Sequence, residues 1–213
     1  MTSTTLPDNA FTLRPAKTSD ELALRTICYQ TADAGQALTT PLDYPELPAL
    51  LYASPYLVAP GALGLVAEDE AGVCAYALGC LDSRAFYDWM NATWLAQKRT
   101  QYALPGNLTS FQAKLLARLH APCHTHPALT AFPAHLHINL LPRAQGKGLG
   151  RRLIFALLEA MQQGGASGVH WGVHCGVNPL NTGAVAFYRK LGFAVVLSEP
   201  GCEWFATSLD KAP

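Results

Sequence analysis

Charged residues are scarce in this chain of 213 residues. Asp, Glu, Lys and Arg make up 14% of it, against about 25% in an average soluble protein. The 15 basic and 15 acidic side chains cancel, so no excess of one sign predicts a nucleic-acid partner, an anionic membrane surface or a highly cationic acceptor. The hydrophobic share of 50% predicts a packed globule, and the length predicts one domain over residues 1–213, with 1–10 as a flexible N-terminus.

Membrane, export and metal patterns are also missing. No segment reaches the ~18 uninterrupted apolar residues of a membrane span, and residues 1–10 lack a basic and apolar leader pattern. The six cysteines are scattered without a C-x-x-C pair, so we expect reduced thiols and a cytoplasmic protein. Cys123, His124 and His126, with His120 nearby, match no standard zinc spacing, and no metal site is predicted.

What the sequence does contain is a regular succession of strand and helix patterns. Strands are expected at 11–15, 64–68, 73–81, 135–141, 169–175, 193–197 and 202–207. Helices are expected at about 19–31, 42–52, 83–103, 111–119, 149–163 and 181–191. This order predicts a mixed α/β fold in which a central, mixed and twisted sheet of about six to seven strands is flanked by helices. Residues 83–134 form a helical insertion before the central strand, which we expect to cover an acceptor pocket or a partner subunit.

The most informative stretch runs from His135 to Gly150, where a strand stopped by Pro142 leads through a glycine-rich turn into a helix. The first turn of a helix has unpaired N–H groups, and glycines let an anion come close to them. The stretch does not match a dinucleotide-binding fingerprint, because Arg151 occupies the position of the third glycine. It does not match a Walker A loop either, because Gly148 occupies the position of the Ser or Thr.

Two motifs follow each other in this half of the chain. Gln145-Gly-Lys-Gly-Leu-Gly150 matches Gln/Arg-x-x-Gly-x-Gly/Ala, and residues 181–193 match Asn-x-x-Ala-x-x-x-Tyr-x-x-x-Gly-Phe. Together they resemble the signatures of the GNAT acetyltransferases, closely over 135–197 and in outline over 11–82. A narrower resemblance, through the histidine-bearing strand and the inserted helices, is to bacterial acetyltransferases related to the acetyltransferase-like domain of O-GlcNAcase, which in the eukaryotic enzyme is considered a pseudo-acetyltransferase.

The resemblance implies a GNAT fold and acetyl-CoA as the cofactor. Main-chain groups of Leu140 and Leu141 would pair with the pantetheine arm, which Asn181 would also touch. Ala184 and Tyr188 would complete the contacts of the second motif. The pyrophosphate would lie against the loop and helix start, namely Gln145, Gly146, Lys147, Gly148, Leu149, Gly150 and Arg151.

Acetyl transfer to an amine requires the ammonium to lose a proton, and the departing thiolate benefits from gaining one. Tyr188 is the candidate general acid, because a phenol of pKa about 10 holds its proton at neutral pH; simple packing on its helix is the alternative. His135 and His137 are candidates for the general base, against an ordinary role as core histidines. No carboxylate stands on their strand.

Three polar residues are candidate contacts for the acceptor. They are Asp33 in the loop after the first helix, Asp82 at the end of the hairpin, and Asn139 on the central strand. Either aspartate could instead cap a helix.

These features predict an N-acetyltransferase that moves an acetyl group to a primary amine of a small molecule or protein by direct attack. The alternative is a non-catalytic acyl-CoA sensor or protein-interaction domain, because the carboxylate is missing and the insertion is large. A homodimer is left open, and neither a nucleic acid nor a membrane is an expected partner.

Overall fold

The computed structural model describes residues 10–104, 106–107, 109–165 and 172–208. Its strands form one sheet of seven in the order β1-β2-β3-β4-β5-β7-β6. The pair β4–β5 is parallel, and the other neighbouring pairs are antiparallel. The strands are β1 Thr12–Pro15, β2 Ala62–Asp69, β3 Gly72–Cys80, β4 Ala134–Leu140, β5 Gly172–Val177, β6 Ala194–Glu199 and β7 Cys202–Ser208. The predicted mixed α/β fold with a mixed sheet is confirmed.

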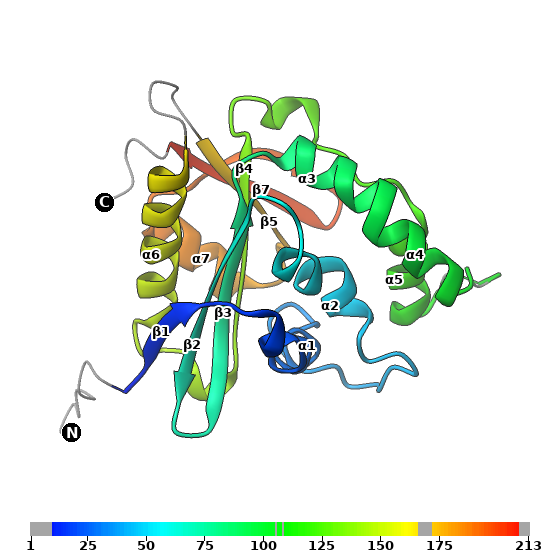
Figure 1. Cartoon of the computed structure of the whole chain (residues 1–213), viewed down its shortest axis with the longest axis horizontal. Coiled ribbons are helices and arrows are strands. Elements are labelled where there is room, and N and C mark those ends of the chain that lie inside the picture. Colours follow the sequence, from blue (N-terminus) through cyan, green and yellow to red (C-terminus); the bar gives the residue numbers. More distant parts are fainter. Residues whose placement is uncertain (1–9, 105, 108, 166–171, 209–213) are drawn as a thin grey trace.

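Helices lie on both sides of this sheet (Figure 1). The α-helices are α1 Glu21–Gln30, α2 Leu47–Tyr52, α3 Ser83–Trp89, α4 Leu95–Gln101, α5 Phe111–His120, α6 Leu149–Gly164 and α7 Thr182–Lys190. Short 3-10 turns are η1 Thr18–Asp20, η2 Ser54–Leu57, η4 Pro127–Leu129 and η5 Pro142–Ala144, and η3 Met90–Trp94 is a π-helical stretch between α3 and α4. None of the described helices is long and apolar enough to cross a membrane.

One predicted helix begins later than expected, and the start of one predicted strand is not described. The helical pattern expected from residue 42 begins only at Leu47, because Pro45 disfavours helical geometry at Tyr44 before it. The strand expected from residue 169 is described from Gly172 onward, and its first three positions lie outside the described residues.

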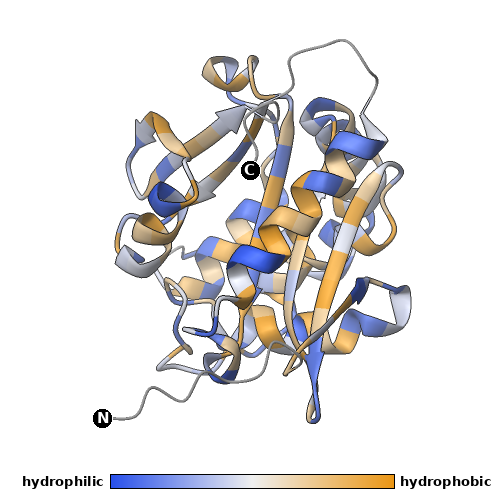
Figure 2. Cartoon of the chain, turned by 90° about the vertical axis from the view of Figure 1, so that its left-hand side faces the viewer, coloured by the Kyte–Doolittle hydropathy of each residue, from blue (hydrophilic) through white to orange (hydrophobic). Residues whose placement is uncertain are grey.

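The two faces of the sheet pack against different helices. A Cβ added to Gly79 of β3 would meet the Met161 side chain of α6, so this face of β3 lies under α6. The next residue of the strand, Cys80, points the opposite way and contacts His135. Figure 2 shows α6 from outside, with apolar colours on the strands behind it and polar residues on the outer side of the helix. Side-chain alternation therefore places His135, His137 and Asn139 on the face away from α6.

The helices between β3 and β4 build a second hydrophobic core. Its members come from α2, the end of β3, α3, the π-helical stretch, α4 and α5. They include Leu47, Leu50, Cys80, Phe86, Met90, Leu95, Leu115, Leu116 and Leu119. The inserted helices thus pack on α2 and the end of β3, on the same face of the sheet as His135 and His137.

The sheet opens between its two parallel strands. The register of β4 and β5 pairs Ala134 with Val173 and His135 with His174 and extends no further, while β5 goes on pairing with β7 as far as Val177. Beyond His135 the two strands diverge, which leaves one edge of β4 without a strand partner.

Candidate cofactor cleft and catalytic site

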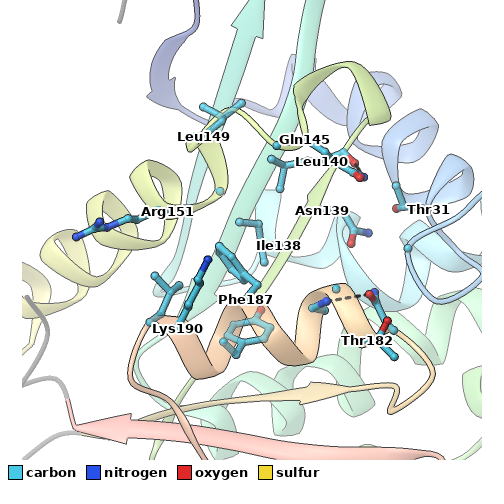
Figure 3. A pocket seen from close by; sticks show the side chains of 18 of the residues that line it. Thr31, Ile138, Asn139, Leu140, Gln145, Leu149, Arg151, Thr182, Phe187 and Lys190 are labelled. Carbon is cyan, nitrogen blue, oxygen red and sulfur yellow. Dashed lines mark hydrogen bonds between the residues drawn. The ribbon is translucent and has the colours of Figure 1, made fainter. Parts of the chain in front are cut away.

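A cleft of about 1380 Å³ lies where β4 and β5 diverge. Residues of β4, the loop into α6, α7 and the loop after α1 line it. In Figure 3, Ile138, Asn139 and Leu140 follow β4 along one side, while Phe187 and Lys190 project from α7. Ligand sites of ordinary size measure about 300–1,000 Å³, so this cleft suits a long ligand.

The main chain of β4 turns polar groups toward this cleft. The Leu141 N–H donates to the Cys74 carbonyl of β3 at 2.9 Å, which makes these two residues a hydrogen-bonded pair. In an antiparallel ladder such pairs alternate, so the N–H and C=O groups of Ile138 and Leu140 point away from β3, toward the side where β5 has diverged. The structure therefore supports Leu140, but not Leu141, as a main-chain contact for an extended ligand. Ile138 replaces Leu141 as the second such contact.

The glycine loop before α6 leaves its N–H groups accessible. Gly146 and Gly148 have φ values of 71° and 73°, a left-handed conformation that glycine adopts without steric cost. A Cβ on either residue would meet no atom within 4 Å, so their surroundings are open. Gly148 is the N-cap of α6, and no side chain caps this end. The positive end of the helix dipole thus faces the cleft, as an anion site requires.

Side chains around this loop divide into cleft-lining and outward-facing ones. Gln145 donates from Nε2 to the Leu140 carbonyl at 2.9 Å and so fastens the loop to β4. Arg151 and Lys190 line the cleft and add positive charge. The Lys147 side chain instead lies with Nζ 5.6 Å from the centre of the Phe11 ring and is not among the lining residues, so its contact with the pyrophosphate stays a prediction.

Helices α6 and α7 approach each other closely at the cleft. A Cβ on Gly150 would lie 3.3 Å from the Phe187 ring, so this position favours glycine for packing reasons. On α7, Asn181 is the N-cap and accepts from the Ala184 N–H at 3.0 Å, the interaction drawn in Figure 3. Asn181, Ala184 and Tyr188 all line the cleft.

Tyr188 reaches the cleft from a buried position. Its side chain is 5% exposed and packs against Phe193 and Phe205, with ring centres 5.3 and 5.9 Å away. Burial raises the pKa of Tyr188 well above its usual value, and hydrogen bonding with the Cys175 thiol raises it further. The hydroxyl therefore keeps its proton at neutral pH, as a general acid must before reaction.

His135 is a core histidine with both ring nitrogens in use. Nε2 lies 2.6 Å from the Tyr56 hydroxyl, and Nδ1 lies 2.8 Å from the Ser83 hydroxyl. Burial, with smaller effects of His174 and His137, lowers the pKa of His135 to about 3. It does not line the cleft between β4 and α7. The geometry therefore does not favour His135 as a base, and its strand position alone could not reveal these partners.

His137 is placed differently from His135. Its Nε2 atom is buried and has no hydrogen-bond partner among the described residues. Its ring lies between Tyr52 and Tyr76, with centres 5.9 and 5.7 Å away. Burial lowers the pKa of His137 to about 4. The imidazole is thus neutral near pH 7 and can accept a hydrogen bond, but it is a weak base.

The three candidate acceptor contacts are not brought together. Asn139 lines the cleft and donates from Nδ2 to the Tyr76 hydroxyl at 3.0 Å. Asp33 lines the cleft from the turn after α1. Asp82 lies elsewhere and caps α3, where its Oδ1 accepts from the Ala85 N–H at 2.9 Å, which agrees with the alternative considered for it.

The structure adds cleft residues that the motifs did not identify. Thr31, Gln36, Leu180, Phe187 and Lys190 all line it. Phe187 could have been found, because it lies within the second motif at a helical spacing from Ala184 and Leu191. The loop after α1 carries no recognisable pattern. Among the described residues, no three His, Cys, Asp or Glu side chains gather into a metal site.

The fold and the cleft define an α/β protein built to hold an extended, anionic ligand at a split in its sheet. The model of the Acetyltransferase (GNAT) family matches residues 123–193. The crystal structure of SsHAT is similar over 94% of this chain and 98% of that one, with 33% identity and a TM-score of 0.84. The chain therefore belongs to the GNAT acetyltransferases, a family of acyltransferases, and the predicted resemblance is confirmed.

More distant relatives agree with this assignment. Protein O-GlcNAcase from Rattus norvegicus is 27% identical over 192 residues, which are 85% of this chain and 20% of that protein, and the Mus musculus protein gives the same values. The chain thus spans about a fifth of the length of these curated relatives. A crystal structure of a Thermoplasma acidophilum N-acetyltransferase shares the fold at 14% identity, with a TM-score of 0.58 over 93% of this chain and 98% of that one.

Proposed function

We propose that the chain transfers an acetyl group from acetyl-CoA to a primary amine. The observation that carries this proposal is one cleft that combines the open main-chain edge of β4, the uncapped start of α6 and the Tyr188 hydroxyl. The Thermoplasma N-acetyltransferase of the same fold was solved in complex with coenzyme A, which supports the choice of cofactor. Acetyl-CoA supplies the thioester from which the acetyl group passes to the amine.

The residues of the chain divide the binding task by chemistry. Ile138 and Leu140 can bind an amide-bearing arm through main-chain groups, as an added strand would. The N–H groups from Gly146 to Gly150 and the Arg151 side chain can hold phosphate oxygens. Asn181 keeps α7 in place through its cap and lines the same cleft.

Proton transfer is assigned to one side chain and to solvent. Tyr188 donates its proton to the departing thiolate, which its place in the cleft supports. Its raised pKa keeps the hydroxyl protonated until that step. The amine loses its proton to water, because the low pKa values of His135 and His137 make both histidines poor proton acceptors.

A pair of glycine variants tests the cofactor site. Gly146→Val and Gly72→Val both place a side chain at a left-handed φ, and neither Cβ meets a neighbour. Only Gly146 belongs to the cleft. We expect Gly146→Val to weaken coenzyme A binding by at least about tenfold in calorimetry, a loss of about 1.4 kcal/mol, and Gly72→Val to leave it unchanged. Equal affinities in all three proteins would overturn the assignment.

A non-catalytic acyl-CoA sensor is the second candidate. It is favoured by one specific observation, namely that the histidine face of β4 carries no carboxylate and no histidine of ordinary basicity. Release of free thiol from acetyl-CoA in the presence of a broad panel of primary amines separates the two functions. Coenzyme A binding without thiol release would support the sensor. The cytoplasmic location and the homodimer stay predictions.

A further inference from the structure

Lys190, the last residue of α7, is a cation without a partner on the cofactor cleft. Within the described part of the chain it takes part in no ion pair and no hydrogen bond. The same holds for Arg151 of α6, whose guanidinium carbon lies 4.8 Å from the centre of the Phe155 ring. All three residues line the cleft. This part of the cleft therefore carries positive charge for which the described residues supply no anion.

The two cations lie away from the acidic part of the cleft. Of the described residues that line it, Asp33 alone is acidic, and the loop that carries Asp33 touches the N-cap Asn181. Lys190 ends α7, nine residues and thus roughly 13 Å along the helix from Asn181. In Figure 3, Arg151 and Lys190 project from α6 and α7 on the side of the cleft away from Thr31.

The hollow surface continues past Lys190 over α7. Phe187 and Lys190 also line a second, shallower depression of about 660 Å³, together with Gly183, Ala186 and Arg189. Both residues thus border both hollows, so a ligand that leaves the cleft past α7 lies across them. Arg189 adds a third cation on this path.

Phe187 gives this part of the cleft an aromatic surface. A Cβ on Gly150 would lie 3.3 Å from its ring, so one edge of the ring is fixed against α6. The ring is only partly buried. Bases stack on aromatic rings and on guanidinium planes, and Arg151 supplies such a plane over Phe155. We call Arg151, Phe155, Phe187 and Lys190 the outer end of the cleft; it offers surfaces for a flat ring beside cations for a phosphate.

The glycine loop and the outer end suit different phosphates. The N–H groups from Gly146 to Gly150 carry the partial charge of a helix start, about half an elementary charge, and suit a pyrophosphate. Coenzyme A also has a phosphate monoester on the 3′ position of its ribose, beside the adenine, with a charge of about −1.5 to −2 at pH 7. Lysine is a compact point charge that binds such a group. An unpaired lysine next to an aromatic ring matches this part of coenzyme A.

We propose that the outer end of the cleft is the site of the 3′-phosphoadenosine group of coenzyme A. Lys190 selects for the 3′-phosphate, and Phe187 is a stacking surface for the adenine. The proposal rests on the coenzyme A site proposed above and extends that site past the pyrophosphate. Lys190 sets the choice of cofactor and takes no part in proton transfer.

Calorimetric titration with coenzyme A and with 3′-dephospho-coenzyme A tests the site without relying on turnover. We expect the unchanged protein to bind coenzyme A about tenfold more tightly than the dephospho form, as a charge-assisted contact allows. Lys190→Met should remove most of this preference by weakening coenzyme A binding, and should change the affinity for the dephospho form by less than about twofold. Lys190→Arg should keep the preference, because it keeps the charge.

The matched control is Lys114→Met on α5, which removes another exposed lysine of a helix outside both hollows. It should keep the whole preference. Equal affinity for the two ligands in the unchanged protein would overturn the proposal. So would a preference that survives Lys190→Met, which is the result expected if Lys190 only complements the dipole at the end of α7. Equal weakening of both ligands would also overturn it and would assign Lys190 to the pyrophosphate.

The same titrations separate this proposal from the proposed function. If neither ligand binds the unchanged protein, the coenzyme A site as a whole is refuted together with its outer end. Thiol release from acetyl-CoA is measured separately with the panel of primary amines. If release is absent with every amine while the preference and its loss in Lys190→Met persist, acetyl transfer fails and the 3′-phosphate site stands.

Discussion

Gly35, in the turn after α1, lies directly against the side chain of Asn181, the N-cap of α7. A Cβ added to Gly35 would lie 2.8 Å from Asn181 Nδ2, closer than such atoms approach. The contact joins the two sides of the divided sheet, because α1 packs on β3 and β4 while α7 lies against β5 and β7 through Tyr188. Both residues also line the cofactor cleft.

The first prediction concerns Gly35→Ala. The added methyl group should displace Asn181 and weaken coenzyme A binding about tenfold, or about 1.4 kcal/mol. A backbone penalty of about 1 kcal/mol in unfolding free energy should accompany it, because φ is +88°. Gly61→Ala is the control, since its φ is +71° and its Cβ would meet nothing within 4 Å. It should lose similar stability and bind coenzyme A normally; weakened binding in both variants would refute the contact as the cause.

The second prediction compares two helix caps. Asn181 and Asp82 each accept a hydrogen bond from an N–H group three residues later, at 3.0 and 2.9 Å. Replacing either by Ala should reduce the unfolding free energy by about 1 kcal/mol, measured by urea titration. Only Asn181→Ala should also raise the dissociation constant for coenzyme A, because Asp82 is outside the cleft. An effect of Asp82→Ala on acceptor KM would restore its role as an acceptor contact.

Local patterns in the sequence were enough for most of the fold. The amphipathic repeat of 149–163 and the glycines after it predict α6 nearly to the residue, because the pattern itself records which side is buried. The glycine loop was found for the same reason, since left-handed φ angles restrict residue type.

Contacts between segments that are distant in the sequence could not be predicted from local patterns. His135 and His137 share one face and one pattern, yet only His135 finds partners on η2 and α3 for both nitrogens. Likewise, the N–H of Leu141 is taken by β3, a matter of strand register that single-sequence reading does not resolve. The loop after α1 reaches the cleft through tertiary packing alone.

The third prediction concerns acid stability. His135 and His137 have pKa values of about 3 and about 4 in the folded chain, against about 6.5 when unfolded. Below pH ~6.5 the unfolded chain binds more protons, so the unfolding free energy should fall as pH drops toward 4 and be unaffected by these groups above pH 7. The loss should be roughly 2 kcal/mol per histidine between pH 7 and pH 5.

A histidine variant separates this effect from other titrating groups. His135→Gln should remove roughly 2 kcal/mol of the loss between pH 7 and pH 5 in urea unfolding. Parallel pH profiles for the unchanged protein and His135→Gln would show that the fold does not suppress protonation of His135.

The last prediction concerns the acid. Tyr188→Phe removes one hydroxyl and keeps the ring that packs against Phe193 and Phe205. If the hydroxyl protonates the leaving thiolate, kcat for thiol release should fall by roughly 100-fold or more, while the dissociation constant for coenzyme A stays within about twofold. Tyr44→Phe, at a position 42% exposed, is the control and should change neither value. Unchanged kcat in Tyr188→Phe would assign the side chain to packing, whereas loss of coenzyme A binding along with activity would make its hydroxyl part of the binding site.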